Sequence, residues 1–134
     1  MRQLKNISNS PFTSDAAIIL EIRSLFPNFD EPLQKLIAGM AGCSPFLHDL
    51  VKKEVNWIKK VLKSESSPEE TITNEVLQSS NISKSLRVAK ARISLWTALQ
   101  DLSGNWKLEE VSKCLSEFAD FSVKIALKYS IESL

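Results

Sequence analysis

The 134-residue sequence has little glycine and few residues suited to catalysis. It contains three glycines, two cysteines and one histidine. Glycines at 39, 42 and 104 cannot form a phosphate-binding loop or a dinucleotide-binding turn, because both need closely spaced glycines after a strand. The one histidine, His48, lies in a helical first turn beside lysines, so we expect a surface residue rather than the base of a hydrolytic triad.

The sequence also lacks long apolar runs and any excess of charge. No stretch approaches the ~20 apolar residues of a membrane span, and the N-terminus lacks the apolar run of a signal peptide. Seventeen basic and sixteen acidic residues leave a net charge of +1, too small to attract nucleic acid or an anionic membrane. We therefore expect a cytoplasmic protein that binds neither membranes nor nucleic acid.

Residue clusters that could bind a metal or form a disulfide are missing as well. Cys43 and Cys114 lie far apart and form no C-x-x-C motif, so we expect two buried, reduced thiols. No Asp-x-Asp pair is present to bind Mg²⁺, and the acidic pairs Glu69-Glu70 and Glu109-Glu110 fit the first turns of helices. The chain is expected to have no complete active site and no cofactor, and to be inactive alone.

What the sequence does contain is helical patterning with clear start and stop signals. Thr13, Ser14 and Asp15 can cap a helix that Pro27 ends, and Asp30 can cap a second that Gly39 and Gly42 end. Ser44-Pro45 and Ser67-Pro68 each combine a cap with a first-turn proline.

The longer apolar stripes lie in the middle and at the end of the chain. Apolar residues recur every three or four positions from Pro45 to Leu62 and from Leu86 to Leu102, where Gly104 provides a stop. A further stripe from Leu108 to Tyr129 predicts that the last two helices form an antiparallel hairpin. We predict an all-α fold: an irregular bundle of about five helices with a long C-terminal helical hairpin. Residues 1–12 are expected to be a flexible N-terminus and residues 13–134 a single helical domain.

Four basic residues form a possible interaction surface. Lys84, Arg87 and Lys90 share one helical face, which suits an acidic partner but also suits a merely solvated face. Arg92 lies nearer the apolar rows and should have a partner such as Asp101 or Asp120. Trp57, Trp96 and Trp106 are expected to be core or interface anchors.

Five short segments follow one another in a recognisable order: SPFLHDL at 44–50, LRVAKARISL at 86–95, ALQDLSG at 98–104, LEEV at 108–111 and LSEFAD at 115–120. Their serial order resembles one protein family, the glutamate-ammonia-ligase adenylyltransferases. The N-terminal region of that family runs S-P-F-L-x-x-L, L-R-x-x-[KR]-x-R-x-x-L, A-x-x-D-L-x-G and L-E-E-V-x-x-x-L-S-x-x-A-D. The resemblance covers roughly residues 36–127. The structural signature residues that it picks out are Ser44, Pro45, Phe46, Leu47, Asp101, Gly104 and Asp120.

The resemblance implies a bacterial system of nitrogen control. Members of the family transfer AMP from ATP, with Mg²⁺, to a tyrosine of glutamine synthetase and remove it again, under glutamine and the PII protein. Their nucleotidyltransferase motif has no counterpart in this chain, so no catalytic residue is carried over. The chain is similar to the helices that precede and pack against the family's AMP-removing domain, and its implied partners are that domain or glutamine synthetase.

One departure from the family pattern affects the predicted structure. The family usually has a proline shortly after S-P-F-L-x-x-L, where this sequence reads Glu54-Val55-Asn56. We therefore expect the helix from Pro45 to continue unbroken past this point.

Two hypotheses about function follow. In the first, the chain is the N-terminal helical segment of an adenylyltransferase without its catalytic domain, and Leu95, Trp96 and Leu99 form an exposed apolar patch. In the second, the chain is an independent helical interaction module that pairs through its long helices, with its apolar rows covered. Nucleic-acid binding through Lys84, Arg87 and Lys90 is disfavoured by the net charge.

Overall fold

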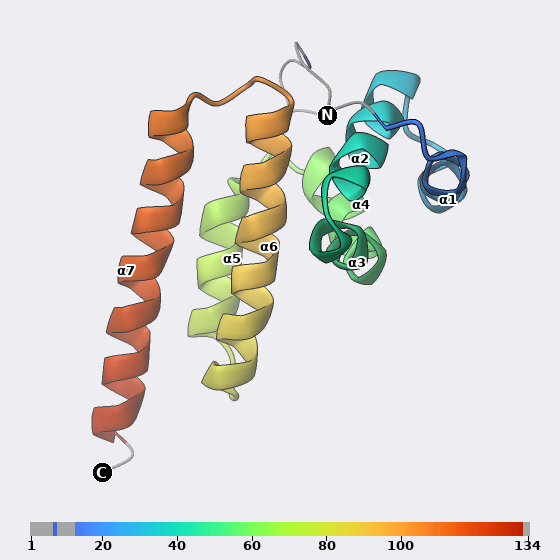
Figure 1. Ribbon diagram of the computed structural model, residues 1–134. Coiled ribbons are helices and arrows are strands. Elements are labelled where there is room, and N and C mark those ends of the chain that lie inside the picture. Colours follow the sequence, from blue (N-terminus) through green and yellow to red (C-terminus); the bar gives the residue numbers. More distant parts are fainter. Residues whose placement is uncertain (1–6, 8–12, 133–134) are drawn as a thin grey trace.

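Every regular element is a helix in the residues described by the computed structural model, which are Ile7 and residues 13–132 (Figure 1). The helices are α1 (Ala16–Leu25), α2 (Glu31–Cys43), α3 (Pro45–Lys53), α4 (Val55–Lys63), α5 (Pro68–Leu77), α6 (Ile82–Leu102) and α7 (Leu108–Glu132). The all-α class is confirmed, with seven helices in this part of the chain rather than about five. The predicted flexible N-terminus falls on residues that, apart from the half-buried Ile7, lie outside the described part.

Short polar side chains fix the starts of five helices. Each accepts a hydrogen bond from a backbone N–H in the first turn, which would otherwise lack a partner. The predicted capping residues are confirmed at Asp15, Asp30, Ser44 and Ser67, and Asn81 caps α6 in the same way. Local sequence signals therefore determine where these helices begin.

Two expected helix boundaries are wrong. Gly39 and Gly42 do not end α2, which continues to Cys43 because Ser44, the cap of α3, is the residue that leaves the helical conformation. Gly42 instead permits a close approach of the chain before α1: a Cβ atom added there would lie 2.8 Å from Oγ1 of Thr13.

The long helix expected from Pro45 onward is broken. Lys53 ends α3 and Val55 begins α4, with Glu54 between them at φ −111° and ψ 26°. The break occurs without a proline, and the Glu54 side chain binds Arg92 of α6.

The central helix of the fold is α6. It packs against α5 and α7 in one direction and against α2 and α3 in the other. Figure 1 shows α5, α6 and α7 side by side with alternating directions, while α1 to α4 form a second group. The fold thus has two helical groups joined through α6.

The core lies where these groups meet, and α7 contributes little to it. Leu95, Trp96 and Leu99 are all buried, so the expected exposed patch at these residues is wrong: α2, α5 and α7 cover α6.

The structure matches the predicted C-terminal hairpin only loosely. Helices α6 and α7 run antiparallel and touch, but Cys114 is the one buried residue of α7. None of the helices described is both long enough and apolar enough to cross a membrane.

Candidate functional site

The basic residues of α6 do not form one surface. Lys84, Arg87 and Lys90 are exposed, whereas Arg92 is half-buried and turned inward. Lys84 and Arg92 both line a hollow of about 260 Å³ between α5 and α6. The exposed trio stays a predicted interaction surface, and Arg92 belongs to a separate polar cluster.

Arg92 is held by two carboxylates from other helices. Its Nε donates to Oε2 of Glu54 at 2.5 Å, and Nη1 donates to Oε2 of Glu75 at 3.0 Å. The predicted partners Asp101 and Asp120 are wrong. Asp101 lies more than two turns further along α6, and Asp120 is exposed on α7. Arg92 instead joins α6 to α5 and to the break between α3 and α4.

A larger hollow of about 500 Å³ lies where α5, α6 and α7 meet. It is lined by acidic side chains, by Trp106 and by the thiol of Cys114. Burial, followed by the charges of Glu69 and Glu117, raises the pKa of Cys114 to about 11. A thiol that stays protonated at neutral pH is a poor nucleophile. Cys114 is therefore not activated as a nucleophile in this hollow.

The two cysteines differ in exposure. Cys114 is buried, as predicted, but Cys43 is exposed, so its predicted burial is wrong. Cys43 is the last residue of α2, where the chain turns at the surface towards α3.

Among the residues that the structure describes, no three histidine, cysteine or acidic side chains are grouped so that they could hold a metal ion. The acidic pairs Glu69-Glu70 and Glu109-Glu110 occupy the first turns of α5 and α7, as predicted. Helix N-termini favour such acids for structural reasons.

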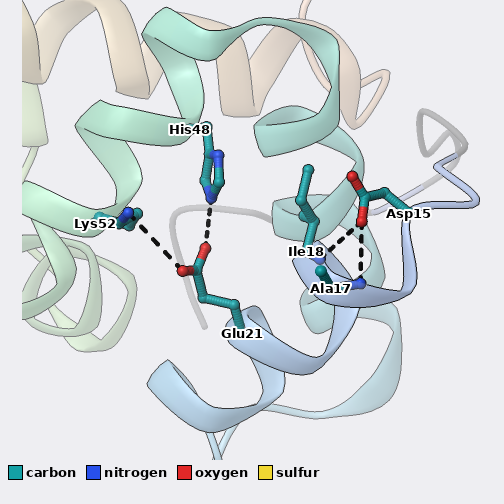
Figure 2. A network of polar contacts seen from close by, with 6 residues as sticks. All are labelled: Asp15, Ala17, Ile18, Glu21, His48 and Lys52. Carbon is teal, nitrogen blue, oxygen red and sulfur yellow. Dashed lines mark hydrogen bonds and ion pairs between the residues drawn. The ribbon is translucent and has the colours of Figure 1, made fainter.

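His48 forms a structural contact between α1 and α3 (Figure 2). Its Nε2 hydrogen-bonds to Oε1 of Glu21, and Nζ of Lys52 lies 3.9 Å from the other carboxylate oxygen. His48 is half-buried rather than fully at the surface. The Glu21 carboxylate, with His48 at one oxygen and Lys52 near the other, thus joins α1 to α3.

The family-signature residues mostly occupy turns and helix ends. Oγ of Ser44 accepts a hydrogen bond from the N–H of Leu47 at 3.1 Å, and Pro45 follows in the first turn of α3. Gly104 has φ 80°, the left-handed conformation predicted for the end of α6. Asp101 and Asp120 are exposed, and Phe46 is 62% exposed. Ser44, Pro45 and Gly104 thus shape the backbone at the start of α3 and after the end of α6.

Exposed apolar side chains are concentrated on α7. Of the ten large hydrophobic residues that are exposed in the described part of the chain, six lie on this helix. Five of them, at spacings of seven, eight, four and four, form what we call the outer row: Leu108, Leu115, Val123, Leu127 and Ile131. They are 45–75% exposed. Several exposed apolar side chains on one helix are a feature of interaction surfaces.

The outer row lies apart from the residues that attach α7 to α6. The attaching residues, Cys114, Phe118, Phe121 and Ile125, recur at spacings of four, three and four and are buried or half-buried. Helix α7 forms the edge of the group in Figure 1, with no described helix beyond it. The apolar stripe that the sequence indicates includes Leu108 and Leu115 but not Val123, Leu127 and Ile131. The four-residue spacing of the last three is nevertheless a signal that the sequence contains.

Comparison with known proteins gives one consistent result. The family model for glutamate-ammonia ligase adenylyltransferase matches residues 33–134, which include all of α7. The chain is 31% identical, over 104 residues, to a bifunctional glutamine synthetase adenylyltransferase/adenylyl-removing enzyme of a Bradyrhizobium species; the match covers 72% of the chain and 11% of that protein. It is 28% identical over 130 residues to the protein of the same name from Rhodopseudomonas palustris, covering 90% of the chain and 12% of that protein. The chain thus spans about a tenth of the length of these curated relatives. No solved structure matches it significantly.

Proposed function

The chain belongs to the glutamate-ammonia ligase adenylyltransferase family, and we propose that it serves as a non-catalytic helical docking unit of that enzyme system. In this proposal the chain works in the bacterial cytoplasm, in the control of glutamine synthetase by adenylylation and deadenylylation. AMP transfer, with its ATP and Mg²⁺, takes place on the rest of an adenylyltransferase/adenylyl-removing polypeptide. The chain contributes a binding surface to it.

The outer row of α7 is the observation that supports this proposal. A helix with apolar residues on two faces is usually covered on both, and α6 covers only the face that carries Phe118 and Ile125. The curated relatives are about nine times longer than the segment that the chain matches, so each contains ample additional polypeptide to cover the second face. We propose that this additional polypeptide is the occupant of the outer row.

Two other occupants follow from different hypotheses. Glutamine synthetase could contact the same row, since it is the protein that the relatives' names identify as the target of their activity. A second copy of the chain could cover it through antiparallel pairing of two α7 helices, which would make the chain an independent interaction module. Both alternatives are outcomes of the experiment below.

The test combines light scattering, binding of a hydrophobic dye and titration of the purified chain. The first titrant is the Bradyrhizobium enzyme from which the matching segment has been removed; the full-length enzyme, which contains its own copy of the segment, is the control. Saturable binding to the shortened enzyme, with loss of dye signal and weaker binding to the control, supports the proposal. Three outcomes would contradict the proposal: binding only to glutamine synthetase, formation of a stable symmetric dimer of the chain, or a dye-negative monomer that binds neither protein.

If the shortened enzyme does not fold alone, both polypeptides are produced in the same cells. Recovery of a soluble complex through a tag on the chain then replaces the titration. Failure to recover the complex, while the full-length enzyme is soluble, would count against the proposed docking.

A further inference from the structure

Glu54 interrupts an apolar helical row. It lies four residues after Leu50 and four before Ile58, so in a continuous helix all three would share one face. Leu50 and Ile58 are buried, and the Glu54 side chain is only 17% exposed. A carboxylate in such a position needs a charged or hydrogen-bonding partner.

Arg92 is a matching interruption on α6 and supplies that partner. The Arg92 side chain is 22% exposed, and its guanidinium carbon lies 5.6 Å from the centroid of the Trp57 ring on α4. The same guanidinium binds Glu54 at 2.5 Å and Glu75 at 3.0 Å. Arg92 is therefore fixed from α5 while it holds the junction of α3 and α4.

The start of α4 has no side-chain cap. Glu54 is the residue that precedes this helix, and its side chain makes no capping hydrogen bond to α4. As first-turn donors, the N–H groups of Val55, Asn56 and Trp57 have no partner within α4. In an unbroken helix, these three N–H groups would bond to the carbonyl groups of residues 51, 52 and 53.

We propose that Arg92 is a latch and that residues 45–63 are a two-state element. While Glu54 is bound to Arg92, the segment is broken into α3 and α4. When Glu54 is released, the segment closes into one amphipathic helix, because Leu50, Ile58 and Leu62 keep the same helical face across the junction. A partner that competes for the Arg92 guanidinium would shift this equilibrium. The latch concerns the chain's own fold and does not depend on docking through α7.

Amide hydrogen exchange of Val55, Asn56 and Trp57, measured by NMR on the 134-residue chain, tests the latch. In Arg92→Met and Glu54→Gln, the proposal predicts that these three amides exchange more slowly, on the order of tenfold, because they gain helical partners. Glu75→Gln is the matched control: it weakens a bond to the same guanidinium away from the break and should leave the exchange of the three amides unchanged.

The direction of the effect separates a latch from a purely stabilising ion pair. If Arg92 only stabilises the fold, its loss should speed exchange throughout α3 and α4, and that result would overturn the proposal. Unchanged exchange in Glu54→Gln would do the same. Should Arg92→Met unfold, Glu54→Leu provides the second test. It completes the apolar row, and the latch predicts a folded chain whose three amides are slowed, whereas fast exchange would contradict it.

Discussion

The indole Nε1 of Trp96 donates a hydrogen bond of 3.0 Å to Oε1 of Glu69, joining the centre of α6 to the first turn of α5. Trp96 is 2% exposed, and this hydrogen bond satisfies the polar group of an otherwise buried ring. Oε2 of Glu69 accepts a second hydrogen bond, of 2.8 Å, from Oγ of Ser67, the residue that caps α5. One carboxylate thus couples the start of α5 to the packing of α6.

Replacing Trp96 by phenylalanine should destabilise the chain by about 2 kcal/mol, since it removes this hydrogen bond and leaves unfilled volume beside α5. Glu69→Gln keeps an acceptor for the indole and should cost about 1 kcal/mol or less. Urea denaturation followed by circular dichroism measures both values. Equal losses in the two variants would mean that the charge of Glu69, rather than the hydrogen bond, carries the effect.

The stability of the chain should fall between pH 9 and pH 11 through Cys114. Its folded-state pKa is raised from 9.0 to about 11, so the folded state binds the thiol proton more tightly than the unfolded state. This contribution is fully present below pH 9 and is lost as the pH rises, by about 2 to 3 kcal/mol in total. Cys114→Ala should have a flatter stability profile than the parent over this interval. Parallel profiles for the two proteins would show that Cys114 titrates normally.

The two thiols should also react differently with a thiol reagent at pH 8. Cys43 is exposed and should be modified within minutes, whereas buried, protonated Cys114 should react only after unfolding. Counting modified thiols by mass spectrometry, with and without urea, checks this difference. Two equally fast modifications in native buffer would contradict the burial of Cys114 where α7 packs against the core.

Gly104→Ala should destabilise the chain by about 1 kcal/mol, because φ at this residue is 80° and a Cβ atom is disfavoured in that conformation. Gly104→Asn is the control, since asparagine tolerates the left-handed region better and should cost less. Thermal unfolding of the three proteins measures the order. If alanine is tolerated as well as asparagine, the backbone of the turn must adjust to the added Cβ atom.

The sequence predicts best those features that depend on a few adjacent residues. The caps at Asp15 and Ser67 are set by one side chain and the backbone within three positions, and the left-handed turn at Gly104 by one residue. These signals do not depend on how the helices pack. Helix starts could therefore be located before any tertiary structure was known.

Features that depend on contacts distant in sequence were missed. The break lies at Glu54, which binds Arg92, 38 positions away, and apolar periodicity from Pro45 to Leu62 gives no sign of it. Glu54 and Arg92 were nevertheless detectable as two charges of opposite sign within apolar rows. Treating them as a pair would have predicted both the partner of Arg92 and a perturbation of the helix.

The exposed apolar surface was misplaced for a similar reason. Periodicity shows that a helix has two apolar faces but not which neighbour covers which face. The order of packing places α6 between other helices, so Leu95 and Leu99 are covered, and α7 at the edge, so Leu115 and Val123 are not. Which residues form the candidate docking surface could thus be decided only from the fold.

Substitutions in the outer row should abolish docking without unfolding the chain. Leu115 and Val123 are both exposed, so replacing each by lysine should change stability by no more than about 0.5 kcal/mol. A lysine at the centre of an apolar contact is desolvated without a partner, so binding should weaken roughly tenfold or more. Asn74→Lys, at an exposed position on α5, is the matched control for added charge.

The decisive measurement is a binding affinity for the shortened adenylyltransferase/adenylyl-removing enzyme, determined by calorimetry. Three chains are compared: the parent, the double variant Leu115→Lys, Val123→Lys, and the control Asn74→Lys. Docking through α7 predicts tight binding by the parent and by Asn74→Lys, and little or none by the double variant. Equal binding by all three chains, or no binding by the folded parent, would contradict a docking role for α7.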